Sequence, residues 1–161
     1  VELYFTGHSL GGALATIAAL DTQFYLNQTK TQTNQTSTTG GGGSRNQKQI
    51  ISLKIYTFGA PRVGNHPFAK LVNKMINDSW RVCLDGDPVP AWPKCWLLGN
   101  LYKHAKHQAL IDVRGNIIID PLNVENLLHN SRKINFSRHN LDLYLEALSA
   151  ADGLETETQT V

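Results

Sequence analysis

Apolar residues along the chain follow two kinds of spacing. Residues 1–6, 50–58 and 80–84 are short runs rich in aliphatic, aromatic and β-branched side chains, which predicts three strands. Residues 13–26 are rich in Ala and Leu without Gly or Pro, and residues 67–76 place their apolar side chains on one helical face, which predicts two helices. The order strand, helix, strand, helix, strand is typical of βαβ units and a parallel sheet with right-handed crossovers.

The second half of the chain predicts a hairpin and a closing helix. Residues 102–113 and 116–119 have the composition of two strands, and a turn sequence at residues 114–116 joins them. Residues 124–128 predict a short helix, and residues 141–148 predict the last one. The fold class that we expect is therefore α/β, with a mainly parallel sheet flanked by helices.

Residues 28–49 interrupt the apolar pattern. Gln, Thr, Asn and Ser dominate this stretch, and residues 40–43 are consecutive glycines. Such a composition buries too little apolar surface to offset the entropy lost on ordering the backbone. We therefore expect a low-complexity surface loop at residues 28–49 within one domain at residues 1–153. A polar tail at residues 154–161 is expected to fray.

Composition excludes several classes of protein. The chain has 161 residues, of which 41% are apolar, too many for a disordered chain. Its 15 Lys and Arg against 13 Asp and Glu leave no basic excess, so we expect no nucleic-acid partner. Cys83 and Cys95 are too few for a disulfide framework or a four-ligand zinc site. We favour two unpaired, partly buried thiols over a bridge between them, and we expect no metal.

The junction between the first strand and the first helix carries a candidate nucleophile. There the chain reads Gly7-His8-Ser9-Leu10-Gly11, which fits the G-x-S-x-G nucleophile elbow. The serine of such an elbow sits at the tip of a strained turn, and we expect that neither Gly7 nor Gly11 tolerates a side chain. The helix N-terminus directs free N–H groups at the serine. We therefore expect Ser9 to be a nucleophile and the N–H of Leu10 to bind an oxyanion.

A serine nucleophile needs a base, and the base needs an orienting carboxylate. On this fold the carboxylate follows the serine along the chain, and the histidine comes last. Asp87 comes directly after the third strand, and the prolines behind it would stiffen its loop. We favour Asp87 as the acid, with Asp85 as the alternative. A turn-forming role for Asp87 is the other interpretation.

Histidines that follow Ser9 are the candidates for the base: His66, His104, His107, His129 and His139. We favour His139, because it lies in a polar loop before the last helix and can reach the carboxyl edge of the sheet. His66 precedes the candidate acid, which violates the chain order, and His129 lies beside the predicted short helix. We expect His104 and His107 to lie on a solvated strand face.

These residues give the sequence a resemblance to the class 3 (fungal-type) lipases of the α/β-hydrolase superfamily. The matching stretches are residues 5–15 (FTGHSLGGALA), 56–65 (YTFGAPRVGN), 81–82 (RV) and 87–90 (DPVP), and His139 ahead of Leu141, Tyr144 and Leu145. The resemblance implies esterase chemistry on acylglycerols or related lipids, without a cofactor. It carries over Ser9 as nucleophile, Asp87 as acid, His139 as base and Leu10 as oxyanion donor.

Members of this family have an N-terminal half ahead of the elbow, with a second oxyanion residue and a lid helix, and the stretch at residues 28–49 is longer than their usual connection. We therefore interpret residues 1–153 as part of a catalytic domain. We expect the 161 residues alone to be a poor catalyst, because a missing oxyanion donor costs about 10²–10³ in rate. A bare apolar edge at the first strand predicts aggregation. The expected partner is a lipid ester at a membrane or droplet surface. The compartment stays open, with a secreted or membrane-associated parent protein as one option.

Two other functions stay open at this point. A catalytically silent, lipase-like lipid-binding or scaffold module would normally have lost one residue of the triad, and all three candidates are present. An acyltransferase would use the same acyl-enzyme with an alcohol in place of water. Fold alone does not separate these functions.

Overall fold

The computed structural model describes residues 1–35, 51–93, 101–122, 124–125 and 135–153, and only the backbone at residues 30–35. Its strands are β1 (Glu2–His8), β2 (Ser52–Phe58), β3 (Asp78–Leu84), β4 (His107–Ile111) and β5 (Ile117–Ile119). Its α-helices are α1 (Leu10–Gln35), α2 (His66–Met75) and α4 (Leu141–Ala151), and short 3₁₀ helices are η2 (Val89–Ala91) and η3 (Phe136–His139).

The five strands form one sheet in the order β1-β2-β3-β4-β5. The first three pairs are parallel and the β4–β5 pair is antiparallel, so the prediction of a mainly parallel sheet with a terminal hairpin is confirmed. Among the described strands, β1 lies at one edge and pairs only with β2. The aggregation expected from this edge stays a prediction.

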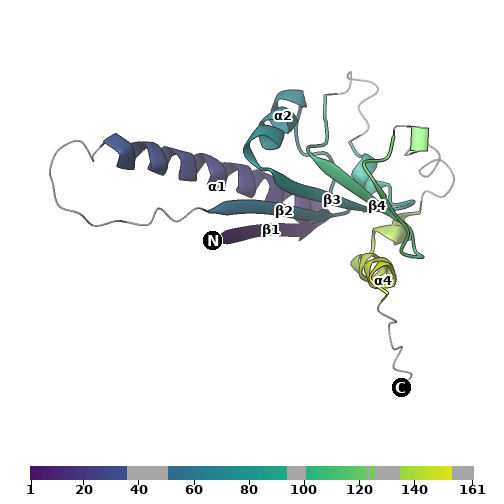
Figure 1. The fold of residues 1–161 in the computed structure, drawn as a ribbon. Coiled ribbons are helices and arrows are strands. Elements are labelled where there is room, and N and C mark those ends of the chain that lie inside the picture. The colour runs from purple at the N-terminus through teal and green to yellow at the C-terminus, as the bar shows by residue number, and fades with distance from the viewer. Residues whose placement is uncertain (36–50, 94–100, 123, 126–134, 154–161) are drawn as a thin grey trace.

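Helices cover the two faces of the sheet unequally, with α1 and α2 on one face and α4 on the other (Figure 1). The α1 side is closed by buried aliphatic residues of β2 and both helices: Ala19, Leu20, Leu53, Ile55, Val72 and Ile76. The α4 side is closed by Val82, Leu84, Ile111, Tyr144 and Ala147. Since successive strand residues point to opposite faces, β3 contributes Val82 and Leu84 to α4 while Ser79 and Arg81 face α1 and α2.

Helix α1 is longer than the sequence pattern predicts. It continues to Gln35, so residues 28–35 of the predicted loop are helical and that part of the prediction was wrong. Gln is a good helix former, and contacts one turn apart support the polar end: Gln23 Nε2 donates to Asn27 Oδ1 at 3.1 Å, and the Thr29 hydroxyl donates to Leu26 O at 3.0 Å. A polar helix end therefore needs no apolar stripe once the buried turns before it are fixed.

Other predicted elements differ at their boundaries. The first hairpin strand spans only His107–Ile111, and α4 continues to Ala151. Residues 36–49, most of the predicted helix at 124–128 and the tail at 154–161 lie outside the described residues. In the part of the chain that the structure describes, no helix combines the length and the apolar character needed to cross a membrane.

Candidate active site

Ser9 occupies the turn between β1 and α1. Its φ is 56°, in the left-handed region that a residue with a side chain adopts only at a cost in free energy. Its N–H donates to Phe58 O at 2.9 Å, which ties the turn to the end of β2. The strained turn predicted for the elbow is therefore present, and Ser9 stands at the carboxyl edge of the sheet.

Glycines around Ser9 let the strand and the helix approach closely. A Cβ on Gly7 would lie 2.4 Å from the carbonyl carbon of Gly11, and a Cβ on Gly12 would lie 2.7 Å from Ala60 Cβ. A Cβ on Gly11 would meet nothing within 4 Å, so the expectation that Gly11 excludes a side chain was wrong. The backbone of Gly11 faces Gly7, whereas its own Cβ position points into open space. The crowded second glycine is Gly12, which the sequence analysis missed.

Three residues far apart in the sequence meet above this turn. The ring of His139 joins the other two, with Nε2 2.7 Å from Ser9 Oγ and Nδ1 2.8 Å from Asp87 Oδ2. Ser9 follows β1, Asp87 follows β3 in the loop to η2, and His139 ends η3 directly before Asn140 caps α4. We call Ser9, His139 and Asp87 the serine cluster.

Asp87 is held by donors on both carboxylate oxygens. Its side chain is 0% exposed, and a buried carboxylate is tolerated only when hydrogen bonds replace its lost hydration. The Val89 N–H donates to Oδ1 at 2.9 Å, and the hydroxyl of Tyr144 donates to Oδ2 at 2.7 Å beside the His139 ring. The structure thus brings Asp87, rather than Asp85, onto His139.

Two aromatic residues that the sequence analysis did not single out surround His139. The His8 ring lies against it with ring centroids 4.6 Å apart, and Tyr144 contacts His8 edge-on at 5.9 Å. Burial, and then the charge of His139, lower the pKa of His8. The buried His8 Nε2 has no hydrogen-bond partner among the described residues. A histidine beside the elbow serine was the available sequence signal for His8, whereas nothing local distinguished Tyr144 from a core residue.

The alternative histidines lie elsewhere. His104 is half-buried ahead of β4 and hydrogen-bonds Pro90 O through Nε2 at 2.7 Å, so the solvated strand face expected for it was wrong, and desolvation holds its pKa well below the usual value. His107 is exposed as expected, with Nδ1 2.6 Å from Asp120 Oδ2. His66 begins α2, and His129 lies outside the described residues.

Leu10 supplies the first N–H of α1 directly after Ser9. The first N–H groups of a helix have no acceptor within it, so this donor is available to a negative charge next to Ser9. Cys83 is a buried free thiol, and burial raises its pKa. Cys95 lies outside the described residues.

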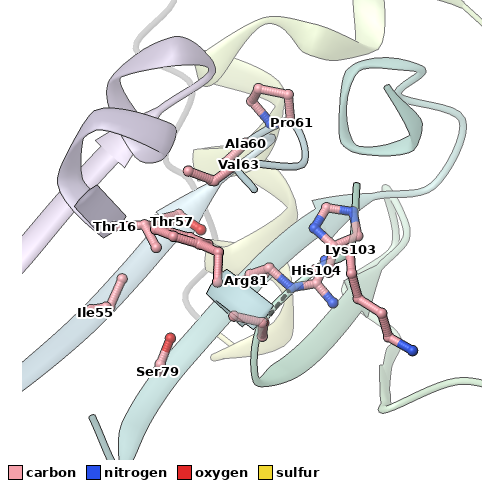
Figure 2. Close-up of a pocket in the computed structure, with 12 residues that line it drawn as sticks. Thr16, Ile55, Thr57, Ala60, Pro61, Val63, Ser79, Arg81, Lys103 and His104 are labelled. Carbon is pink, nitrogen blue, oxygen red and sulfur yellow. Dashed lines mark hydrogen bonds between the residues drawn. The ribbon is translucent and has the colours of Figure 1, made fainter. Parts of the chain in front are cut away.

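A small hollow, part of it open to solvent, lies on the face of the sheet that α1 and α2 cover (Figure 2). Its lining comes from α1, α2, β2, β3 and the loops that follow them: Thr16, Ile55, Thr57, Ala60, Pro61, Val63, Phe68, Ser79, Arg81, Lys103, His104 and Ala105. No member of the serine cluster is among them. Arg81 Nε donates to Ala105 O at 3.0 Å, and the buried Thr57 hydroxyl has no partner among the described residues.

Comparisons with known proteins agree with this geometry. A family model described as Lipase (class 3) matches residues 1–96. Secreted mono- and diacylglycerol lipase 1 of Fusarium solani is 35% identical over 107 residues, which are 66% of this chain and 24% of that protein. Phospholipase A1-IIalpha of Arabidopsis thaliana is 26% identical over 157 residues, which are 92% of this chain and 29% of that protein.

Solved structures show the same fold. A triacylglycerol lipase whose catalytic centre is a serine protease triad matches with a TM-score of 0.58 and 26% identity, over 86% of this chain and 46% of that chain. The chain spans about a fifth to a third of the length of the first curated relatives that it matches. The family model covers more than half of the chain and includes the elbow. The chain therefore belongs to the class 3 lipase family and has the α/β-hydrolase fold.

Proposed function

We propose that the protein is a serine-dependent carboxylic ester hydrolase, with Ser9 as nucleophile, His139 as general base and Asp87 as the acid that orients the base. The observation that carries the proposal is the unbroken hydrogen-bonded series from Ser9 Oγ through the His139 ring to Asp87. Within it, residues 1–153 are part of the catalytic domain.

The first half of the reaction follows from this series. His139 Nε2 takes the proton of Ser9 Oγ as that oxygen attacks the ester carbonyl, and the buried charge of Asp87 stabilises the imidazolium that forms. The Leu10 N–H at the start of α1 donates to the oxyanion of the tetrahedral intermediate. His139 then returns its proton to the departing alcohol, and an acyl ester remains on Ser9.

The second half uses the same groups with water in place of the alcohol. His139 Nε2 takes a proton from water as the water attacks the acyl ester, the fatty acid leaves and Ser9 Oγ recovers its proton. Every step uses groups of this chain, the ester and water, so the proposal includes no metal or organic cofactor.

Lipid esters are the substrate class that we propose. The Fusarium solani relative is named for mono- and diacylglycerols, the Arabidopsis thaliana relative for phospholipids, and the structural neighbour for triacylglycerols. Their shared feature is a fatty-acyl ester, which fits the acyl-enzyme chemistry of the serine cluster. The proposed partner is accordingly a lipid surface that presents such esters.

Release of fatty acid from lipid emulsions tests this proposal. Triacylglycerol, diacylglycerol and phosphatidylcholine are offered to the full-length protein and to its Ser9→Ala variant, with and without an acceptor alcohol. We expect fatty acid from at least one lipid with the wild type and none above background with the variant. Equal release by both proteins contradicts the role of Ser9, and ester product in place of fatty acid identifies an acyltransferase. Absence of both products, together with binding of the wild type to the emulsion, supports the lipid-binding module.

A further inference from the structure

Tyr144 connects the core of the domain to the serine cluster. It lies on α4 with 0% of its surface exposed, among the residues that close the α4 side of the sheet. Its hydroxyl lies between the end of β3 and the loop that follows: the Leu84 N–H is 3.0 Å away and Asp87 Oδ2 is 2.7 Å away. A residue of the hydrophobic core thus reaches the candidate acid directly.

The direction of both hydrogen bonds is fixed. Leu84 N–H can only donate, so it occupies a lone pair of the Tyr144 oxygen, and the single hydroxyl proton is left for the carboxylate. Burial raises the pKa of Tyr144 far above its ordinary value, which keeps that proton in place. Tyr144 is therefore a permanent donor to Asp87 Oδ2.

Asp87 Oδ2, which accepts the Tyr144 hydroxyl, also accepts a hydrogen bond from His139. Asp87 Oδ2 receives the Tyr144 hydroxyl and the His139 Nδ1–H, while Oδ1 receives the Val89 N–H. A donor on each side leaves the carboxylate no free rotation, and a second donor on Oδ2 withdraws part of the charge that faces the imidazole.

The contact between Tyr144 and Asp87 lies beside Gly59, where a side chain would not fit. A Cβ on Gly59, whose φ is +58°, would lie 2.9 Å from Asp87 Oδ2, 2.9 Å from the Tyr144 hydroxyl and 3.2 Å from His139 Cε1. The three groups therefore meet around a residue that has no side chain. A side chain at position 59 would therefore displace Asp87, Tyr144 or His139.

We propose that Tyr144 is a positioning residue for the hydrolysis assigned above, and this inference rests on that proposed function. Tyr144 holds Asp87 Oδ2 in line with His139 Nδ1 and moderates how strongly the carboxylate attracts a proton onto His139. Its position, five residues after His139 on the first turns of α4, lets one segment of the chain contact Asp87 twice.

Several other groups that can gain or lose a proton lie around His139. His8 on β1 lies against its ring, Ser9 lies at Nε2 and Asp87 lies at Nδ1. The neighbouring Arg138 donates from Nη1 to Asp85 O at 2.6 Å, and the Cys83 thiol is buried on β3. None of these groups changes in a variant that removes only the Tyr144 hydroxyl.

The Tyr144→Phe variant of the full-length protein tests the inference on a water-soluble ester. We expect kcat to fall by about tenfold to a hundredfold while KM changes little, because the loss concerns orientation of the base rather than substrate binding. We expect the acid limb of kcat/KM to move to higher pH. Without the Tyr144 proton, Asp87 keeps its full charge toward His139 and stabilises the imidazolium form more strongly.

Tyr56→Phe is the matched control. The Tyr56 hydroxyl also donates to a carboxylate, that of Asp78, at 3.1 and 3.2 Å, but this pair involves the start of β3, far from the serine cluster. We expect its kcat and its pH profile to equal those of the wild type.

Site-specific 3-fluorotyrosine at position 144 covers the case in which Tyr144→Phe fails to fold. Fluorine makes the hydroxyl a stronger donor without removing it, so the acid limb should move the opposite way, to lower pH. The inference is overturned if the folded Tyr144→Phe protein keeps the wild-type pH profile, or if the fluorinated protein does. If the wild type hydrolyses no ester and its Ser9 does not react with a fluorophosphonate, the proposed function itself has failed.

Discussion

Two polar groups of residues lie in different places on the same sheet, one at its carboxyl edge and one on the face that α1 and α2 cover, and they differ in how their hydrogen bonds are arranged. In the serine cluster on the α4 side, each side chain contacts the next, from Ser9 to His139 to Asp87. In the hollow beneath α1 and α2, the half-buried side chains of Arg81 and His104 hydrogen-bond backbone carbonyls. The Thr57 hydroxyl there has no partner among the described residues.

This difference shows what separates a site from a polar core. Contacts to backbone carbonyls hold the loops after β3 in place, but they leave no reactive atom activated. In the proposed reaction, the serine cluster lets His139 take the proton of the Ser9 hydroxyl while Asp87 keeps its charge. We therefore expect substitutions in the serine cluster to change the rate, and substitutions in the hollow to change the free energy of unfolding.

Asp87→Asn should give the largest effect. The amide keeps the size of the side chain but removes the charge that stabilises the His139 imidazolium, so kcat should fall by about 10⁴. Activity on a soluble ester and circular dichroism of the same sample check this. A properly folded variant that loses less than tenfold would contradict the role of Asp87.

Gly7→Ala should break the scaffold beneath the cluster. Its Cβ would lie 2.4 Å from the Gly11 carbonyl carbon, and such backbone overlap should lower the free energy of unfolding by more than about 3 kcal/mol. Gly11→Ala is the control, because its Cβ meets open space and Ala in a helix is favoured over Gly by roughly 0.5–1 kcal/mol. Urea unfolding measures both. If both variants lose the same free energy of unfolding, crowding at Gly7 does not hold the elbow in its conformation.

His104→Gln should separate acid sensitivity of folding from that of catalysis. The pKa of folded His104 lies well below 6.5, so its contribution to stability is complete above the unfolded pKa. It is lost as pH falls below about 6.5, by up to about 1.4 kcal/mol per pH unit.

The Gln variant keeps a donor for Pro90 O and does not titrate, so its stability should fall less between pH 7 and pH 5. His8 titrates in both proteins and cancels in the comparison. The acid limb of activity depends on His139 and should stay unchanged. If the free energy of unfolding of both proteins falls equally between pH 7 and pH 5, His104 is not a source of the acid sensitivity.

Thr57→Val should have the smallest effect. It replaces an unpartnered buried hydroxyl with a methyl group of the same shape, which is neutral or stabilising by up to about 1 kcal/mol. Thermal unfolding checks this. A loss above that size would reveal a hydrogen bond, for instance to a buried water, inside the hollow.

The fold and the three residues of the serine cluster could be predicted because their signals are local or ordered along the chain. The elbow needs a strand, a small turn and a helix within a few residues, and the acid and base follow in a fixed order. The family resemblance drawn from these motifs is confirmed by the family model.

What the sequence missed depends on contacts between distant elements. The contact of Tyr144 with Asp87 requires α4 to pack on β3, and the contact of His104 with Pro90 requires the loop before β4 to lie against the loop after β3. The crowding at Gly12 rather than Gly11 depends on Ala60, which follows β2. The polar C-terminal part of α1 has no apolar stripe from which a helix could be predicted.

Fluorophosphonate labelling tests the central claim, that His139 and Asp87 activate Ser9, without assuming any substrate. The full-length wild type, Ser9→Ala and Asp87→Asn proteins are labelled together, and the modified peptide is mapped by mass spectrometry. We predict rapid labelling of the wild type at Ser9, none of Ser9→Ala, and strongly slowed labelling of Asp87→Asn. A folded wild type that stays unlabelled, or a label on another residue, would contradict the account.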